Sequence, residues 1–158
     1  MSDFFSYGGA AAPAPAPAAA AAPRAILGEL GGEDWEKFIA HTARRRHPAG
    51  ALIVQAGEAD AALCFIASGR VELQGPGGGR ESRESRGEGE VFGLLSFLDG
   101  APSDVTVRAG AEAPVELLRL TPEQLQQLAA WQPRIAVLLL RDLAAHVAAR
   151  LRQARPGD

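Results

Sequence analysis

The stretch that decides the fold is residues 89–107, with the sequence GEVFGLLSFLDGAPSDVTV. Valine and threonine end it, and these residue types favour strands. Glycine and proline earlier in the stretch mark turns, and the residues around Gly93 to Ser96 suit the start of a short helix. We therefore expect a short helix, a loop and a strand over 105–108 in this order.

Further short apolar runs lie on both sides of this stretch. They predict strands over residues 51–54, 63–68 and 71–74 before it, and over 105–108 and 115–120 at its end and beyond. Val71 and Leu73 alternate with Glu72 and Gln74, which is typical of a half-buried antiparallel strand. Residues 75–89 are rich in glycine and contain the run RESRESR over 80–86, so we expect a solvated loop there.

One helix is expected before the strands and two after them. The first begins near Glu33 and Asp34, places Trp35 and Phe38 on one face, and ends before Pro48. Its end would carry the run RRRH over residues 44–47, which we interpret as a solvated helix terminus. A basic patch for phosphates or acidic partners is the alternative.

The two later helices begin at prolines. Pro122 opens the first, with Thr121 as its cap, and Pro133 opens the second, which runs to about Arg152. The order of a helix, several short strands and two helices predicts an α+β domain with a small barrel or roll.

The chain is expected to form one folded domain between two disordered ends. Residues 10–23 are alanine and proline only, so we expect residues 1–24 to be an extended arm, followed by a domain over 25–152 and a tail over 153–158. The arm begins with an aromatic tip, Phe4, Phe5 and Tyr7, which is either a docking motif for a partner or an inert terminus.

Composition excludes several classes of protein. The net charge of −3 argues against a general nucleic-acid binder, and the sequence contains no hydrolase, phosphate-loop or metalloprotease motif. The three histidines and Cys64 do not form a metal-binding pattern, and Cys64 is expected in the core. With one cysteine and no long apolar run, we expect a cytoplasmic protein that is not an enzyme and has no cofactor, metal or membrane segment.

Two segments resemble the cyclic-nucleotide-binding domain family. Residues 48–58 with 65–71 are similar to the family's opening strands, and residues 89–107 are similar to its phosphate-binding cassette. The resemblance covers about residues 26–152. It implies an antiparallel β-roll, or jelly roll, with a helix before it and two helices after it.

The same resemblance implies a degenerate pocket. Binding members of the family have a glutamate after the phenylalanine-glycine pair and an arginine after the proline, and here these positions are Leu94 and Ser103. Leucine cannot accept the hydrogen bond that the glutamate accepts, and serine cannot supply the positive charge of the arginine. The pocket would be lined by Phe92, Gly93, Leu94, Leu95, Ser96, Pro102, Ser103, Asp104 and Val105.

The last helix carries a broad apolar surface. In the family the corresponding helix commonly forms a dimer seam, so the resemblance implies a homodimer or higher assembly. We expect the interface residues to be Leu140, Leu143, Val147 and Leu151, together with Phe4, Phe5 and Tyr7 of the arm.

The function expected from these features is that of a non-catalytic module acting by protein association, without the usual binding of cAMP or cGMP. The alternative is a ligand-sensing regulatory domain that binds a cyclic nucleotide or another anion in a modified pocket. A regulator acting through a partner is a third possibility. Direct DNA contact by the family's usual helix-turn-helix is not expected, because six residues follow Arg152.

Overall fold

The computed structural model describes residues 26–76 and 83–154. The chain divides into a unit of residues 25–143 and a second unit made of residues 1–24 and 144–158. Of the second unit, the described part is residues 144–154, which form the end of a helix. The predicted arm with Phe4, Phe5 and Tyr7 lies outside the described residues.

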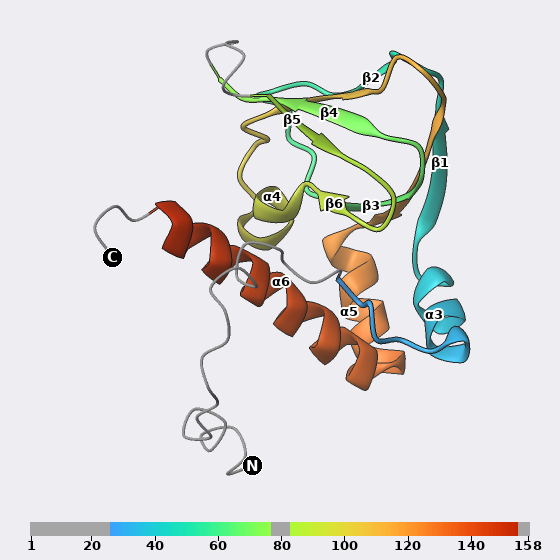
Figure 1. Cartoon of the computed structure of the whole chain (residues 1–158). Helices are drawn as coiled ribbons and strands as arrows, with labels where there is room; N and C mark the ends of the chain where they lie inside the picture. The colour runs from blue at the N-terminus through green and yellow to red at the C-terminus, as the bar shows by residue number, and fades with distance from the viewer. Residues whose placement is uncertain (1–25, 77–82, 155–158) are drawn as a thin grey trace, which may run out of the picture. The chain divides into compact units, whose positions relative to one another are not determined.

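Eight strands form two four-stranded antiparallel sheets (Figure 1). The first sheet has the order β1-β8-β3-β6 and the second the order β2-β7-β4-β5. The strands are β1 (Ala43–His47), β2 (Leu52–Val54), β3 (Leu63–Ser68), β4 (Val71–Gln74), β5 (Arg83–Arg86), β6 (Val91–Phe92), β7 (Thr106–Ala109) and β8 (Val115–Leu120).

The core of the roll lies between the two sheets. Alternate residues on each strand face it, since side chains in a strand point to opposite faces in turn. Val115 and Leu117 of β8 contribute to this core, as do Val71 and Leu73 of β4. Cys64 belongs to the same cluster, so its predicted core position is confirmed. Burial raises the pKa of its thiol to about 12, which keeps it protonated and unreactive.

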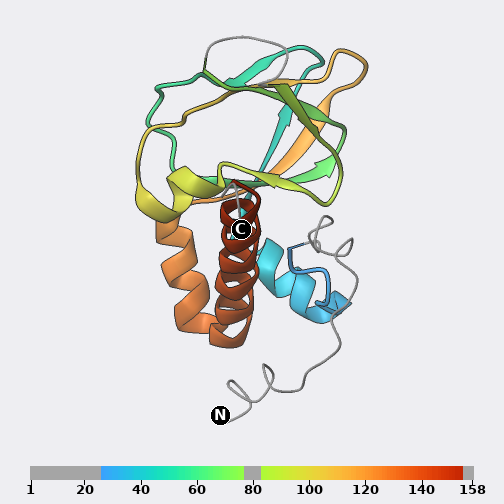
Figure 2. The same cartoon turned by 60° about the vertical axis from the view of Figure 1, so that its left-hand side comes forward.

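The helices are α3 (Gly32–Ile39), α4 (Leu94–Asp99), α5 (Pro122–Trp131) and α6 (Pro133–Ala154). Thr121 caps α5 as predicted, because its Oγ1 accepts a hydrogen bond from the Gln124 N–H at 3.2 Å. In Figures 1 and 2, α3, α5 and the first half of α6 lie on the same side of the strands. The predicted helix–strands–helices order is therefore confirmed.

Aromatic and polar contacts hold α3 in place. Phe38 is fully buried and stacks on Trp35 at 5.4 Å, and its ring lies edge-on to Phe65 of β3 at 5.1 Å. Asp34 of α3 forms an ion pair with Arg134 of α6. These contacts fix α3 against both the first sheet and the start of α6.

Two predictions of local structure were wrong. Residues 44–47 belong to strand β1 and not to a helix end, since α3 stops at Ile39. The predicted loop over 75–89 contains strand β5, which pairs with β4 along its whole length. In both cases strand pairing outweighs the weak β-propensity of charged residues. Helix α6 ends at Ala154, close to the predicted end at about Arg152.

Candidate ligand-binding cassette

The segment from β6 through α4 to the start of β7, residues 91–106, is called the cassette below. It begins with a sharp turn at Gly93, whose φ of +82° lies in the left-handed region. A Cβ atom at this position would lie 2.6 Å from the backbone oxygen of Ala62, which is closer than real contacts allow. Only glycine fits this turn, which directs α4 away from β6.

Replacing Gly93 with alanine is expected to destabilise the fold by more than about 2 kcal/mol, because left-handed strain and the clash with Ala62 add together. Urea unfolding followed by circular dichroism measures this loss. Gly100→Ala is the matched control: Gly100 also has a positive φ, +75°, but open space around it, so about 1 kcal/mol is expected. Equal losses for the two variants would show that the contact with Ala62 does not constrain the turn.

The first half of the cassette is packed into the protein. Phe92, Leu94 and Ser96 are 3%, 5% and 6% exposed. Leu95 points the other way and is 41% exposed. The residue at the position of the family's glutamate, Leu94, is therefore part of the core and has no polar atom on its side chain to offer a ligand.

The second half is tied to the turn that follows β2. The Gly57 N–H donates to the Ser103 carbonyl oxygen at 2.7 Å, and the Ser103 N–H donates to the Glu58 carbonyl oxygen at 3.0 Å. The Ser103 hydroxyl donates to the Val105 carbonyl oxygen at 2.7 Å. The serine side chain thus closes a local turn, while the neighbouring Pro102 and Asp104 are exposed.

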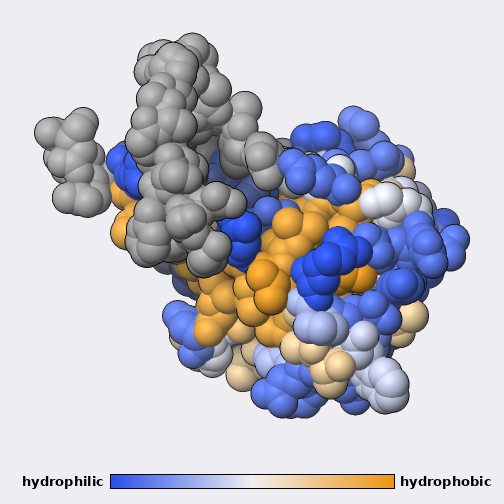
Figure 3. Space-filling model, turned by 90° about the horizontal axis from the view of Figure 1, so that it is seen from below, coloured by the Kyte–Doolittle hydropathy of each residue, from blue (hydrophilic) through white to orange (hydrophobic). Residues whose placement is uncertain are grey.

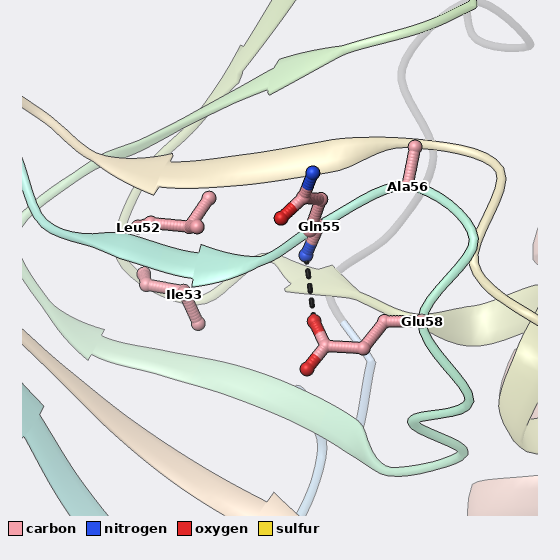
Figure 4. Close-up of a pocket in the computed structure, with 5 residues that line it drawn as sticks. All are labelled: Leu52, Ile53, Gln55, Ala56 and Glu58. Carbon is pink, nitrogen blue, oxygen red and sulfur yellow. Dashed lines mark hydrogen bonds between the residues drawn. The ribbon is translucent and has the colours of Figure 1, made fainter.

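A hollow of about 450 Å³ lies beside this junction (Figure 4). Its lining is Leu52, Ile53, Gln55, Ala56 and Glu58. Leu52 and Ile53 project to opposite sides of β2, and the Glu58 carboxylate turns back to accept the Gln55 N–H at 2.8 Å. The hollow is therefore open and half apolar, with an acidic group at one end.

Glu58 was not predicted as a site residue. It lies far from Ser103 in sequence, and the two meet only because β2 and β7 pair. An acidic residue directly after Gly57 in a tight turn was the only available signal. The Glu58 backbone carbonyl contacts Ser103, while its carboxylate accepts the Gln55 N–H.

The predicted interface residues on α6 differ in burial. Leu140 and Leu151 are 41% and 59% exposed, whereas Leu143 is fully buried. Leu143 therefore belongs to the chain's own core and is not available for an interface in this structure; Val147 is partly exposed.

Two exposed apolar residues near the start of α6 were not predicted. Trp131 at the end of α5 is 74% exposed and Val137 is 58% exposed. Figure 3 shows apolar side chains gathered on the face seen from below, toward which α5 and the first half of α6 lie in Figure 1. Exposed apolar residues in such a group commonly mark an interaction surface.

Membrane-spanning helices and metal sites are both absent from the described part of the chain. No helix in residues 26–76 and 83–154 is long and apolar enough to cross a membrane. In the same residues, no three histidine, cysteine, aspartate or glutamate side chains come together as a metal site would require.

Comparisons with known proteins agree with this architecture. The family model described as "Cyclic nucleotide-binding domain" matches residues 44–130. The chain is 34% identical over 127 residues to the cyclic AMP receptor protein of Thermus thermophilus, covering 79% of this chain and 56% of that protein. It is 33% identical over 111 residues to a cyclic nucleotide-gated potassium channel of Rhizobium etli, covering 70% of this chain and 30% of the channel.

A solved structure supports the same assignment. The crystal structure of the Thermus thermophilus catabolite activator protein superposes with a TM-score of 0.71 at 32% identity, over 83% of this chain and 60% of that one. The chain thus spans about half or less of the length of the two curated relatives named above. The predicted β-roll is confirmed, and the chain belongs to the cyclic nucleotide-binding domain family.

Proposed function

We propose that this chain is a non-catalytic regulatory module that acts by associating with protein, itself or another chain, and that its cassette does not bind cAMP or cGMP in the usual way. The observation that carries the proposal is the state of Leu94 and Ser103. Leu94 is buried in the core, and the Ser103 hydroxyl is used in a bond to the Val105 backbone. Neither side chain reaches out to a ligand.

The energetic cost of these two residues is large. A hydrogen bond to a charged group contributes about 1.5–3 kcal/mol, so losing two of them removes about 3–6 kcal/mol. This corresponds to a loss of about a hundred-fold to ten-thousand-fold in affinity. Asp104, which is exposed and directly follows Ser103, adds a negative charge beside the position of the lost arginine.

Association with protein is supported by the exposed apolar residues at the junction of α5 and α6. Trp131, Val137 and Leu140 leave a large apolar area in water, and a group of this kind is stabilised when a partner covers it. The relatives add a second argument. A receptor protein and a potassium channel both contain a region similar to this chain, as expected of a regulatory module that acts through the protein it contacts.

A ligand sensor is the second candidate, and the hollow beside Ser103 favours it. The hollow has apolar walls from Leu52 and Ile53 and polar groups from Gln55 and Glu58, and a small molecule could be bound there by a mode that does not use the lost arginine. The chain is similar to a cyclic AMP receptor protein and to a cyclic nucleotide-gated channel, so cyclic nucleotides are the first ligands to test.

The test is isothermal titration calorimetry of the full chain with cAMP, cGMP and cyclic di-GMP. We expect no saturable heat up to millimolar nucleotide, because the two charge-assisted contacts are absent. Saturable binding in the micromolar range would overturn the proposed state of the cassette and favour the sensor. Analytical ultracentrifugation of the same sample, with and without nucleotide, measures self-association independently.

A further inference from the structure

Strand β1 is an edge strand. It pairs with β8 over five consecutive positions, from Ala43 opposite Arg119 to His47 opposite Val115. It is the outermost strand of the order β1-β8-β3-β6, and no described strand pairs with its other side. An edge of this kind presents backbone N–H and C=O groups that another extended segment can use.

The exposed side chains of β1 are three consecutive arginines. Arg44 and Arg46 share one carboxylate, that of Glu116, at 3.1 and 3.4 Å. Arg45 has no acidic partner among the described residues, and its Nη1 donates to the Arg44 carbonyl oxygen at 3.2 Å. Three positive charges are thus balanced by one negative charge, in a chain whose net charge is −3.

The local electrostatic field is visible at the end of the strand. The pKa of His47 is lowered from its ordinary value, first by burial and then by the positive charge of Arg45. Both effects disfavour the protonated form of the imidazole.

Strand β5, at one edge of the second sheet, also carries arginines, but these arginines have partners within the sheet. In β5, Arg86 pairs with Glu84 at 2.8 Å, and Arg83 donates through Nε to the Gln74 side chain at 2.7 Å. The arginines of β5 are thus satisfied within their own hairpin. Isolated charges are enough to protect an edge from aggregation, so three adjacent arginines exceed that need.

We propose that the β1 edge is a docking site for an acidic, extended segment of a partner protein, which pairs with β1 as an added strand and places its carboxylates against Arg45, on the face opposite Arg44 and Arg46. This names the class of partner for the association proposed above and rests on that proposal. Strand addition supplies main-chain hydrogen bonds, and carboxylate–guanidinium pairs supply the selectivity. Arg45 would exchange its bond to the Arg44 carbonyl for a carboxylate.

A protein segment fits these observations better than a nucleic acid does. The positive charge is confined to one five-residue strand and is partly offset by Glu116. Nucleic-acid binding draws on a wide positive field that neutralises many phosphates, which a chain of net charge −3 does not suggest. A sheet edge also provides the regular backbone pattern that a strand requires.

The probe is a synthetic peptide of about six residues in which glutamate alternates with valine, since this is the length of a typical strand and the alternation suits a sheet edge. It is titrated into the isotope-labelled full chain and followed by NMR. We expect the amide signals of β1 to shift, binding to weaken with added salt, and Arg45→Glu to lower the affinity by about tenfold. Arg45 is chosen because replacing it breaks no ion pair among the described residues.

Two controls make the result specific. Arg83→Glu applies the same charge reversal to the other edge strand and should leave the affinity unchanged. A peptide with lysine in place of glutamate keeps the alternation and should not bind. Equal binding of both peptides, no effect of Arg45→Glu in a folded chain, or shifts located away from β1 would each overturn the proposal.

Three further outcomes distinguish the docking site from a nucleic-acid site and from the proposed state of the cassette. A mixed-sequence DNA duplex that shifts the same β1 signals with higher affinity than the peptide would overturn it in favour of nucleic acid. No peptide binding together with silent calorimetry for cyclic nucleotides would overturn this inference and leave the proposed state of the cassette standing. Peptide binding together with micromolar nucleotide binding would support the docking site and overturn the proposed state of the cassette.

Discussion

Replacing Leu94 with glutamate and Ser103 with arginine together is expected to raise the affinity of this chain for cAMP by about a hundred-fold to ten-thousand-fold. The two substitutions introduce the acceptor for the ribose hydroxyl and the cation for the phosphate that binding members of the family have. Each restored contact is a charge-assisted hydrogen bond, which is about twice as strong as a neutral one. Isothermal titration calorimetry of the double variant against cAMP measures the gain.

The backbone is already arranged for this change. Gly93 keeps its left-handed turn, and Ser103 is held by two backbone hydrogen bonds to residues 57 and 58. An arginine at position 103 would lie beside the Glu58 segment, whose carboxylate can orient it. A glutamate at position 94 enters a buried site, which disfavours its charged form unless a partner is present. Ser103→Arg alone is therefore expected to recover part of the affinity, and Leu94→Glu alone to reduce stability.

The matched control moves the glutamate by one residue. Leu95→Glu with Ser103→Arg has the same net charge, but Leu95 is 41% exposed and points away from the packed side of α4. This variant should gain less affinity than Leu94→Glu with Ser103→Arg. If both double variants bind equally, net charge and not geometry controls affinity. If the Leu94 double variant is folded and remains silent, then side chains that fill the roll, and not the two lost contacts, prevent binding.

Strands with an apolar pattern could be predicted from the sequence almost to the residue. Leu63–Ser68, Val71–Gln74 and Val115–Leu120 match their predicted ranges. Strands β1 and β5, which were missed, consist mainly of charged and polar residues and lie at sheet edges. An edge strand is held by pairing to its neighbour more than by burial of its own side chains, so its sequence carries little of the periodic signal.

In the cassette, the sequence alone identified the two residues that depart from the family's pattern, but it did not predict their contacts in the fold. Leu94 and Ser103 differ from the family's pattern at single positions, and this can be read directly. The contact between Ser103 and the turn at Glu58 depends on strand pairing between distant segments. On α6, Leu138, Leu139 and Leu140 are consecutive, so periodicity cannot tell which of them faces the core.

Replacing Leu143 with alanine is expected to destabilise the chain by about 2–5 kcal/mol, because a fully buried leucine leaves a cavity when it is truncated. Leu139 and Ile135, one and two turns earlier, are buried as well, so these residues form the stripe of α6 that packs on the chain's own core. Thermal and urea unfolding of the variant, followed by circular dichroism, measure the loss.

Leu140→Ala is the matched control, since it makes the same chemical change in the same helix. Leu140 is 41% exposed, so its truncation should cost less than about 1 kcal/mol in dilute solution. If α6 pairs with a second copy through its exposed leucines, Leu140→Ala should also remove any dependence of the unfolding midpoint on protein concentration, whereas Leu143→Ala should lower the midpoint at every concentration. A larger loss of unfolding free energy for Leu140→Ala than for Leu143→Ala would mean that α6 is rotated about its axis relative to the structure. Leu143 would then be exposed, as its predicted place in an interface requires.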